Sequence, residues 1–317
     1  MENSTQAHES ARPTDDQLAR SFAFEALAEQ RRARRWGNFF KGLFVLYLFA
    51  ILAVSWSGMM KNGVFGTDKI TALVEINGVI APDSDASADF VVTGLRDAFE
   101  DEKTAGVIVR INSPGGSPVQ SGYINDEIKR LKGKHPDIPV YAVIQDICAS
   151  GGYYIAVAAD EIFADKASIV GSIGVRMDGF GFVDAMDKLG VERRLLTAGE
   201  SKGALDPFSP LSQQDVKHVK KLLGQIHQQF IDTVKAGRGD RLADDESIFS
   251  GLFWTGEESK SLGLIDDFGS ASFVARDIIK AKDIVNFTPR RDVFEQFAKR
   301  FGAELAARLT SSLPNLR

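Results

Sequence analysis

The sequence is poor in the residues that build disulfides and metal sites. Cys148 is the single cysteine among 317 residues, so no disulfide can form within the chain. The four histidines are scattered, and none belongs to a His-Glu-x-x-His pattern. We therefore expect no metal site and no metal or organic cofactor. The formal net charge of −5 provides no chain-wide basic field, so a nucleic acid is not an expected partner.

Charge is also absent from one long stretch near the N-terminus. Residues 42–60 contain no charged side chain and would form a helix of about 28 Å, close to the ~30 Å hydrocarbon core of a bilayer. A cleaved signal peptide usually has a shorter apolar region, and a buried helix of a soluble protein is rarely apolar on every side. The sequence therefore predicts a retained transmembrane helix over residues 38–60.

The residues around this helix predict its orientation. Only Lys61 and Lys69 follow it closely, whereas five basic residues gather before or at its start: Arg31, Arg32, Arg34, Arg35 and Lys41. Basic residues tend to remain on the cytoplasmic side of a membrane. We therefore expect residues 1–37 to form a cytoplasmic tail and the chain after about residue 61 to lie on the other side.

Beyond a linker at 61–68, apolar strands alternate with amphipathic helices. The expected strands are 70–80, 106–111, 140–144 and 161–164, and the helices between them are 88–101, 121–131 and 150–159. Such strands predict an α/β domain over residues 69–285, with a parallel sheet covered on both faces. Two further amphipathic helices are predicted, at 212–235 and at 291–309 within the C-terminal segment 286–317.

Two adjacent glycines, Gly115 and Gly116, follow the second expected strand in the sequence Asn-Ser-Pro-Gly-Gly. Glycines at the carboxyl end of a strand let backbone N–H groups face a crevice without a Cβ in the way. Such N–H groups can stabilise a developing oxyanion. A plain Pro-Gly turn would contain the same residues, so this motif alone leaves both interpretations open.

Ser150 lies where a strand is expected to pass into a helix, between Ala149 and Gly151. Small neighbours at such a corner leave a hydroxyl exposed, as in a nucleophile elbow. The match to the Gly-x-Ser-x-Gly pattern is incomplete, because Cys148 stands in place of the first glycine. Ser150 can equally be interpreted as only the N-cap of the helix that follows.

A serine nucleophile needs a base. No histidine is expected near the loops that follow these strands, so a Ser-His-Asp triad is open but unsupported. The alternative base is Lys202, which lies among small and apolar residues in the loop 197–210. An amine accepts a proton only in its neutral form, which burial favours. A lone lysine is otherwise a solvated surface charge.

Together these stretches resemble the signal peptide peptidase A family, also called protease IV, in its short single-domain bacterial form. The resemblance covers about residues 69–285 and rests on the order and spacing of five stretches. They are INSPGGS (111–117), CASGGYYIA (148–156), GSIGV (171–175), ESKGALDPFSPLS (200–212) and GLFWTGEESKSLGLIDDFGS (251–270). Ser150 and Lys202 stand 52 residues apart, which is similar to the family's nucleophile-to-base interval.

The resemblance implies a Clp-protease/crotonase-like α/β fold and a membrane-anchored serine endopeptidase with a Ser–Lys dyad. Ser150 would be the nucleophile and Lys202 its general base. Ser172, in GSIGV, would provide a hydroxyl that helps to hold the lysine. The backbone groups implied for the oxyanion hole are those of Gly115, Gly116 and Gly151.

The same resemblance implies partners and a location. Substrates would be apolar peptides, such as signal peptides left in the membrane after cleavage. The chain would form a homo-oligomer, commonly of eight subunits, in which neighbouring subunits share the serine and the lysine of one site. It would be a single-pass protein of the bacterial inner membrane, with its N-terminus in the cytoplasm and its catalytic domain on the periplasmic or extracytoplasmic side.

Two other functions stay open at this point. An acyl-CoA enzyme of the crotonase type would share the fold and the oxyanion chemistry but would need neither Lys202 nor a membrane anchor. A non-catalytic scaffold of the same fold would organise membrane partners without a reactive Ser150. Reaction with an acyl-CoA, or labelling by a serine-reactive probe, separates these functions from a peptidase.

Overall fold

The computed structural model describes residue 34 and the ranges 36–53 and 69–289. The chain divides into two units, Met1–Thr67 and Asp68–Arg317, and each is described by itself. The predicted linker 61–68, the helix 291–309 and nearly all of the predicted cytoplasmic tail lie outside the described residues.

The described part of the first unit is a helix, Trp36–Ala53, with a mean hydropathy of 1.6. By length and composition alone, this helix is long and apolar enough to cross a membrane. Its large side chains are exposed, for example Phe44 at 62% and Phe49 at 68%. The described helix thus has the character expected of the predicted span, whose last residues, 54–60, lie outside the described ranges.

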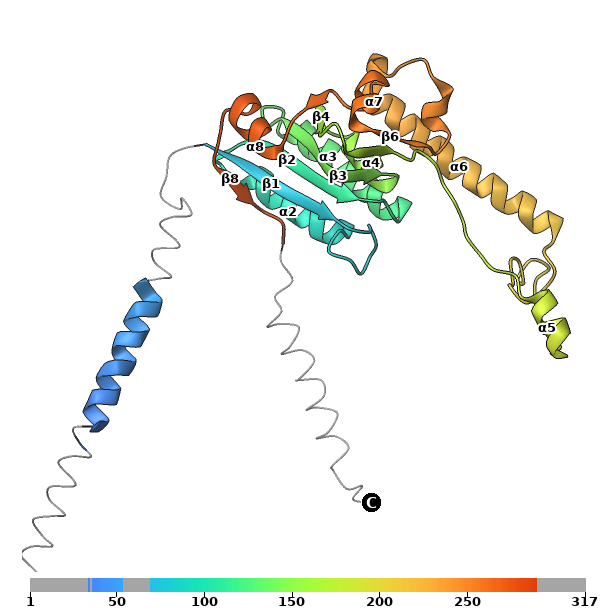
Figure 1. The fold of residues 1–317 in the computed structure, drawn as a ribbon, viewed down its shortest axis with the longest axis horizontal. Helices are drawn as coiled ribbons and strands as arrows, with labels where there is room; N and C mark the ends of the chain where they lie inside the picture. The colour runs from blue at the N-terminus through green and yellow to red at the C-terminus, as the bar shows by residue number, and fades with distance from the viewer. Residues whose placement is uncertain (1–33, 35, 54–68, 290–317) are drawn as a thin grey trace, which may run out of the picture. The chain divides into compact units, whose positions relative to one another are not determined.

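The second unit is built on a mostly parallel sheet (Figure 1). The strands run in the order β6-β5-β3-β2-β1-β8, and β4 pairs with β3 and with β7. Among the described strands, only β6 runs antiparallel to its neighbour, β5. The strands are β1 Ile70–Asn77, β2 Thr104–Ser113, β3 Val140–Ala149, β4 Glu161–Ala164, β5 Ile169–Gly171, β6 Phe253–Thr255, β7 Asp267–Phe268 and β8 Ile284–Asn286. The predicted α/β class is therefore confirmed.

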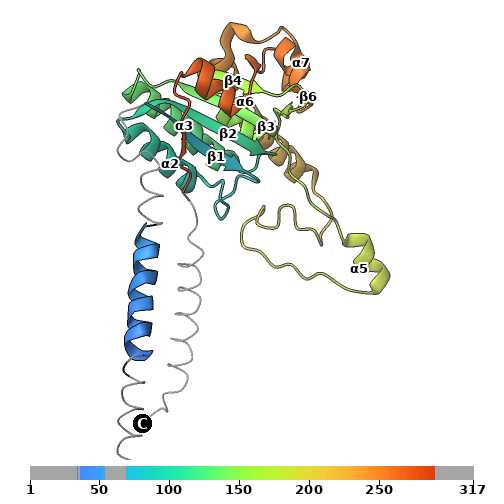
Figure 2. The same ribbon diagram turned by 60° about the vertical axis from the view of Figure 1, so that its left-hand side comes forward.

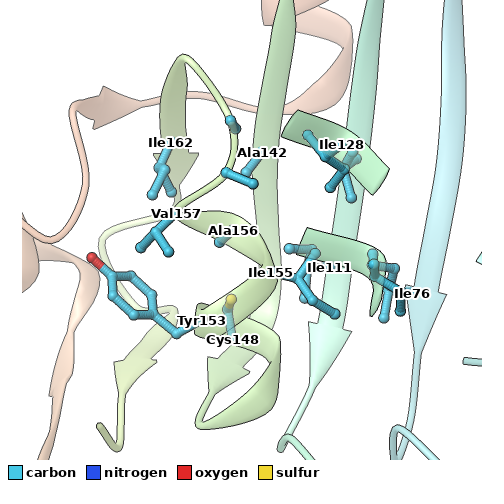
Figure 3. Packing of buried hydrophobic residues seen from close by; sticks show 14 of the residues in the cluster. Ile76, Ile111, Ile128, Ala142, Cys148, Tyr153, Ile155, Ala156, Val157 and Ile162 are labelled. Atoms are coloured by element: carbon cyan, nitrogen blue, oxygen red, sulfur yellow. The ribbon is translucent and has the colours of Figure 1, made fainter. Parts of the chain in front are cut away.

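One face of the sheet is covered by three helices and carries the main core. The helices are α2 Ala88–Glu100, α3 Pro118–Lys134 and α4 Gly151–Ala156. Figure 3 shows how the side chains of α3 and α4 pack onto β1, β2 and β3, with Ile76, Ile111 and Cys148 on the same side of the sheet. The largest fully buried side chain is Tyr153, whose hydroxyl donates to the Leu264 carbonyl at 2.8 Å. This bond ties the first turn of α4 to the C-terminal part of the domain.

The opposite face has a smaller core. Leu73, Ile108 and Val143 point to this side and pack against α8 Ala271–Phe273 and η3 Val274–Ile278. Since successive residues of a strand point to opposite faces, these positions alternate with those of the main core. The sheet is thus covered from both faces, as the near-continuous apolar strands predict.

After β5 the chain leaves the sheet and forms an exposed arm, residues 175–212. The arm contains α5, Val183–Leu189, and leads into the long helix α6, Gln213–Arg238. Figures 1 and 2 both place α5 well away from the sheet. No residue between 174 and 229, a stretch that the structure describes in full, is buried.

The helix α6 matches the predicted amphipathic helix, but only its C-terminal half packs on the core. Phe230 and Val234 are buried, and the Arg238 guanidinium bonds both oxygens of Asp266 at 2.7 and 3.0 Å. The first half carries apolar residues at helical spacing, none of which is fully buried in the described subunit: Val216, Val219, Leu222, Leu223 and Ile226. The remaining elements are η1 Gly239–Arg241, η2 Glu246–Phe249 and α7 Gly256–Ser261.

Candidate active site

A cavity of about 940 Å³ opens where β2, β3 and β5 reach their carboxyl ends. Crevices at the carboxyl ends of parallel strands are where α/β proteins bind their ligands. The other wall of the cavity comes from α6. Five of the residues singled out in the sequence line this cavity: Gly115, Gly116, Ser150, Gly151 and Ser172.

Ser150 sits at the corner between β3 and α4 in a strained conformation. Its φ is 51° and its ψ is −120°, a combination that residues with a side chain rarely adopt. Its N–H donates to the Gly171 carbonyl at 2.8 Å, which fixes the corner against β5. Ser150 occupies the N-cap position of α4, yet its side chain makes no capping hydrogen bond. The hydroxyl is therefore available for chemistry instead of capping the helix.

The neighbours of Ser150 have no room for a side chain. A Cβ on Gly151 would lie 2.4 Å from Ser121 Oγ, and a Cβ on Gly115 would lie 2.7 Å from Ser150 Cβ. A Cβ on Gly116 would lie 2.1 Å from the Ile80 carbonyl oxygen. These contacts are closer than any real Cβ tolerates, so the glycines let two loops approach each other around the hydroxyl.

The three candidate oxyanion donors differ in whether their N–H groups are already hydrogen-bonded. The Gly115 N–H donates to Ser113 Oγ at 3.1 Å and is therefore occupied. The N–H groups of Gly116 and Gly151 have no hydrogen-bond partner among the described residues. The Gly116 nitrogen lies 3.3 Å from the point where a Cβ on Gly151 would stand, so the two N–H groups are close neighbours. Of the three candidates, Gly116 and Gly151 have an N–H group that is not already bonded within the described residues.

Ser172 is the second serine of the cavity, and its backbone is strained in the same way. Its φ is 54°, and its N–H donates to the Leu252 carbonyl at 2.6 Å. The preceding Gly171 lies so close to Trp254 that a Cβ would come within 2.8 Å of the indole ring. The β5–β6 edge thus fixes Ser172 at the rim of the cavity.

Lys202 does not reach this cavity within one subunit. It lies in a turn of the arm, where its N–H donates to the Gly199 carbonyl at 3.1 Å, and its side chain is exposed. It is not among the residues that line the cavity around Ser150. A single subunit therefore contains the serine corner and the lysine, but it does not bring them together.

A histidine lines the cavity, although the sequence led us to expect none there. His227, on α6, lines the same cavity as Ser150, and its Nε2 lies 3.1 Å from the Ile173 carbonyl oxygen. The spacing of His227, Phe230 and Val234 along α6 places them on one helix face, and Phe230 and Val234 are buried. That spacing was readable in the sequence. The packing of this face beside residues 171–175 was not.

Cys148 lies two residues before Ser150 in the sequence but is buried. Burial raises the pKa of the Cys148 thiol, which keeps it protonated and unreactive despite its place two residues before Ser150. Within the described residues, no group of three His, Cys, Asp or Glu side chains is arranged to hold a metal ion.

Comparison with known proteins shows which family this domain belongs to. The family model described as Peptidase family S49 matches residues 132–284, which include the serine corner, the arm and α6. A protein of Synechocystis sp. that is provisionally named as a protease is 33% identical over 204 residues. The match covers 64% of this chain and 71% of that protein. The chain belongs to peptidase family S49. The resemblance to the signal peptide peptidase A family is confirmed, and with it a peptidase domain of the serine class.

Other relatives are longer than this chain. Protease 4 of Haemophilus influenzae is 32% identical over 223 residues, covering 68% of this chain and 35% of that protein. A Brucella melitensis protein named Na(+)/H(+) antiporter NhaA is 50% identical over 175 residues, covering 55% of this chain. The chain spans only about a quarter (24%) of the length of that antiporter-named protein.

Proposed function

We propose that this chain is a membrane-anchored serine endopeptidase in which Ser150 is the nucleophile and Lys202, supplied by a neighbouring subunit, is the general base. One observation carries the proposal. A strained serine whose hydroxyl makes no capping bond lines an open cavity together with two unpaired N–H groups, while the expected lysine stands exposed on an arm outside it. In this proposal one subunit supplies every part of the site except the base.

The oxyanion hole in this proposal consists of the Gly116 and Gly151 N–H groups. Gly115, which the sequence also suggested, plays a structural part because its N–H is bonded to Ser113 Oγ. Two donors from different loops can converge on one oxygen atom, whereas two consecutive N–H groups of an extended chain point apart. Gly115 contributes by letting the loop approach Ser150 closely.

The exposure of the arm favours a base that is supplied by another subunit. An exposed ammonium stays charged, and a lysine becomes a base when it loses its water. The apolar stripe on the first half of α6 and the exposed Leu189, Leu196 and Phe180 give the arm a surface that a second copy of the chain can bury. Burying this surface would remove water from Lys202 and bring it to the rim where Ser172 can accept a hydrogen bond from its amine.

The reaction follows from these positions. Neutral Lys202 takes the proton from Ser150 Oγ, and the oxygen attacks the carbonyl carbon of the scissile peptide bond. The N–H groups of Gly116 and Gly151 donate to the resulting oxyanion. The Lys202 ammonium then gives its proton to the leaving amine, and water hydrolyses the serine ester to free the acid and the hydroxyl.

The helix Trp36–Ala53 is the proposed anchor, with the N-terminus in the cytoplasm and the S49 domain on the other side of a bacterial inner membrane. Its length and apolar composition support the anchor, and the arginines that precede it support this orientation. Apolar peptides, including signal peptides left after cleavage, are the proposed substrates. They partition into the membrane beside the anchored site, and the apolar Tyr154, Phe230 and Val79 line its cavity.

His227 is a second candidate base, because it is the histidine that shares the cavity with Ser150. Its Nε2 is engaged with the Ile173 carbonyl, which leaves only Nδ1 to accept a proton. A Ser150–His227 pair would work within one subunit and would not need Lys202. The two bases therefore differ in whether single subunits are active.

The deciding experiment mixes two inactive variants of the full chain in detergent. Ser150→Ala and Lys202→Ala should each abolish hydrolysis of an apolar peptide. Co-assembled in equal amounts, they should recover about one quarter of wild-type activity, because about one interface in four joins an intact serine to an intact lysine. His227→Gln, which keeps a donor for the Ile173 carbonyl, should stay within about threefold of wild type.

Other results would replace parts of this proposal. Full loss in His227→Gln with activity in Lys202→Ala would assign the base to His227. A silent mixture with an active wild type would place both residues in one subunit. If a fluorophosphonate probe does not label Ser150 in the wild type, the peptidase mechanism is wrong, and turnover of an acyl-CoA would then favour the crotonase alternative.

A further inference from the structure

The strand that ends at Ser150 contains an irregularity just before it. β2 and β3 pair residue for residue up to Ile111 and Ile144, and the next pair is Ser113 with Cys148. β3 therefore uses two more residues than β2 over the same interval, which is a bulge in β3. A bulge leaves backbone groups unpaired and bends the strand, so its geometry has to be held by other groups.

The side chain of Asn112 holds this bulge. Its Oδ1 accepts a hydrogen bond from the Ile147 N–H at 3.3 Å, and its Nδ2 donates to Asp146 Oδ2 at 3.0 Å. From the other side, Ser168 Oγ donates to the Gln145 carbonyl at 2.5 Å. Each of the three bulged residues is thus bonded through a neighbouring side chain, and Asn112 holds two of the three.

The bulge sets the position at which β3 rejoins the sheet. Directly after it, Cys148 pairs with Val170, Ala149 pairs with Gly171, and the Ser150 N–H bonds the Gly171 carbonyl. Without the bulge, β3 would reach the cavity two residues out of register, and a different residue would stand at the corner.

Asn112 also leads into the oxyanion loop on its own strand. Four residues further on is Gly116, whose loop is held by the bond from the Ile80 N–H to the Gly115 carbonyl. One side chain therefore connects the strand that carries the nucleophile to the strand that carries an oxyanion donor. Neither Asn112 nor Asp146 lines the cavity.

We propose that Asn112 is a positioning residue for the nucleophile, and that it acts with Asp146 to fix Ser150 relative to the Gly116 N–H. This inference rests on the proposed function, because it concerns the reaction of Ser150. An amide suits the position since it donates and accepts at once. A carboxylate at 112 could still accept from the Ile147 N–H but would repel Asp146.

This pairing allows a test by exchange of the two side chains. In Asn112→Asp the two carboxylates repel each other, and we expect the peptide kcat and the fluorophosphonate labelling rate of Ser150 to fall about 10- to 100-fold, with KM within twofold. The double variant N112D/D146N restores one donor and one acceptor with the roles reversed, and it should return to within about threefold of wild type. Asp146→Asn alone keeps an acceptor and should lose little.

The matched control is Asn77→Asp, because Asn77 lies opposite Asn112 on β1 and is exposed. It introduces the same charge one strand away and should leave kcat unchanged. All variants are measured as full chains in detergent, well below their thermal unfolding midpoints, so that unfolding does not imitate a loss of kcat.

Three outcomes would overturn the proposal. Asn112→Asp could react like wild type, the double variant could fold but stay slow, or the loss could appear in KM alone. If Asn112→Asp does not fold, the double variant still decides, because it should both fold and react. If the wild type itself is neither labelled nor active, the proposed function falls and this inference falls with it, an outcome that the wild-type assay identifies separately.

Discussion

The serine corner and the arm belong to the same proposed reaction but are built in opposite ways. At the corner, Ala149 and Gly151 are buried, and the strained backbones of Ser150 and Ser172 are each fixed by a hydrogen bond to another strand or loop. On the arm nothing is buried, and Leu196 is 95% exposed. The corner is held by contacts within one subunit, whereas the arm exposes large apolar side chains, which are typical of an interaction surface.

The two regions differ in how much of the surrounding protein holds their backbones. Strained φ values cost about 1–3 kcal/mol each and persist only where surrounding contacts over-determine them. Ser150 and Ser172 have such contacts. The arm also contains one strained residue, Leu205 with a φ of 61°, but none of its residues is buried. We therefore expect the geometry of Lys202 to be set only when a second subunit covers it. The predictions below probe this contrast from the largest effect to the smallest.

The largest effect is expected from a glycine substitution at the corner. In Gly116→Ala the new Cβ would meet the Ile80 carbonyl oxygen at 2.1 Å, so the loop must move and its N–H leaves the oxyanion position. Peptide kcat should fall at least ~100-fold. The matched control is Gly179→Ala on the arm, where nothing lies within 4 Å of a new Cβ. Equal losses in both variants would contradict the contrast.

The second prediction compares two ion pairs. Arg238, whose side chain is 1% exposed, bonds Asp266 and the Gly263 carbonyl. Arg238→Met leaves the carbonyl unpaired and leaves Asp266 with only Arg241 and the Ile162 N–H. We expect a loss of about 2–3 kcal/mol in the free energy of unfolding, measured by denaturant titration. On the arm, Arg193 bonds Asp206 with its side chain 42% exposed. Arg193→Met should barely shift the unfolding midpoint, and a large shift would mean that the arm is as rigid as the core.

The third prediction concerns pH. The hydrogen bond from Arg130, together with that from Arg96, lowers the pKa of Glu127 from 4.5 to about 2 and outweighs the desolvation that raises it. Because the folded-state pKa lies below the unfolded one, the stabilisation is present above about pH 4.5 and is lost as the pH falls toward 2. Glu127→Gln should cost about 1–2 kcal/mol at pH 7, discounted for the half-exposed arginines.

Denaturant titrations of both proteins across this range check the sign. The stabilities of wild type and Glu127→Gln should converge on acidification. A gap that stays constant down to pH 2 would mean that the charge on Glu127 does not stabilise the fold.

The smallest effect is expected at Cys148. Burial raises the pKa of its thiol, so a maleimide should not react with the native protein but should react once the chain is unfolded. Cys148→Ala removes one buried atom and should cost roughly 1 kcal/mol with little change in kcat. Native labelling that inactivates the protein would show instead that the corner opens.

The sequence was most informative where its patterns are local. The apolar strands, the helices α2 and α3 and the glycine pairs around the cavity follow from periodicity and small residues. β3 was predicted to end at Ile144, because Gln145 and Asp146 interrupt its apolar run, yet the strand continues through the bulge to Ala149. The very short strands β5 to β8 were not predicted, since two or three residues carry no readable period.

Five of the predicted site residues line one cavity, but the sequence did not reveal how they are arranged there. The sequence could not show that the Gly115 N–H donates to Ser113 Oγ, or that His227 shares the cavity with Ser150. Both facts depend on how loops from distant parts of the chain meet. Nor could it show whether the proposed base Lys202 reaches Ser150 of a neighbouring copy, because that depends on contacts between chains.

The long-range bonds of the corner have a consequence for how the protein is made. Ser172 is fixed by the Leu252 carbonyl, Gly171 packs on Trp254, and the Tyr153 hydroxyl bonds the Leu264 carbonyl. A nascent chain that has not yet released β6 from the ribosome already contains Ser150 but lacks the groups that hold its surroundings. If Ser150 acts as proposed, the site should therefore stay inert until the last part of the domain has been synthesised.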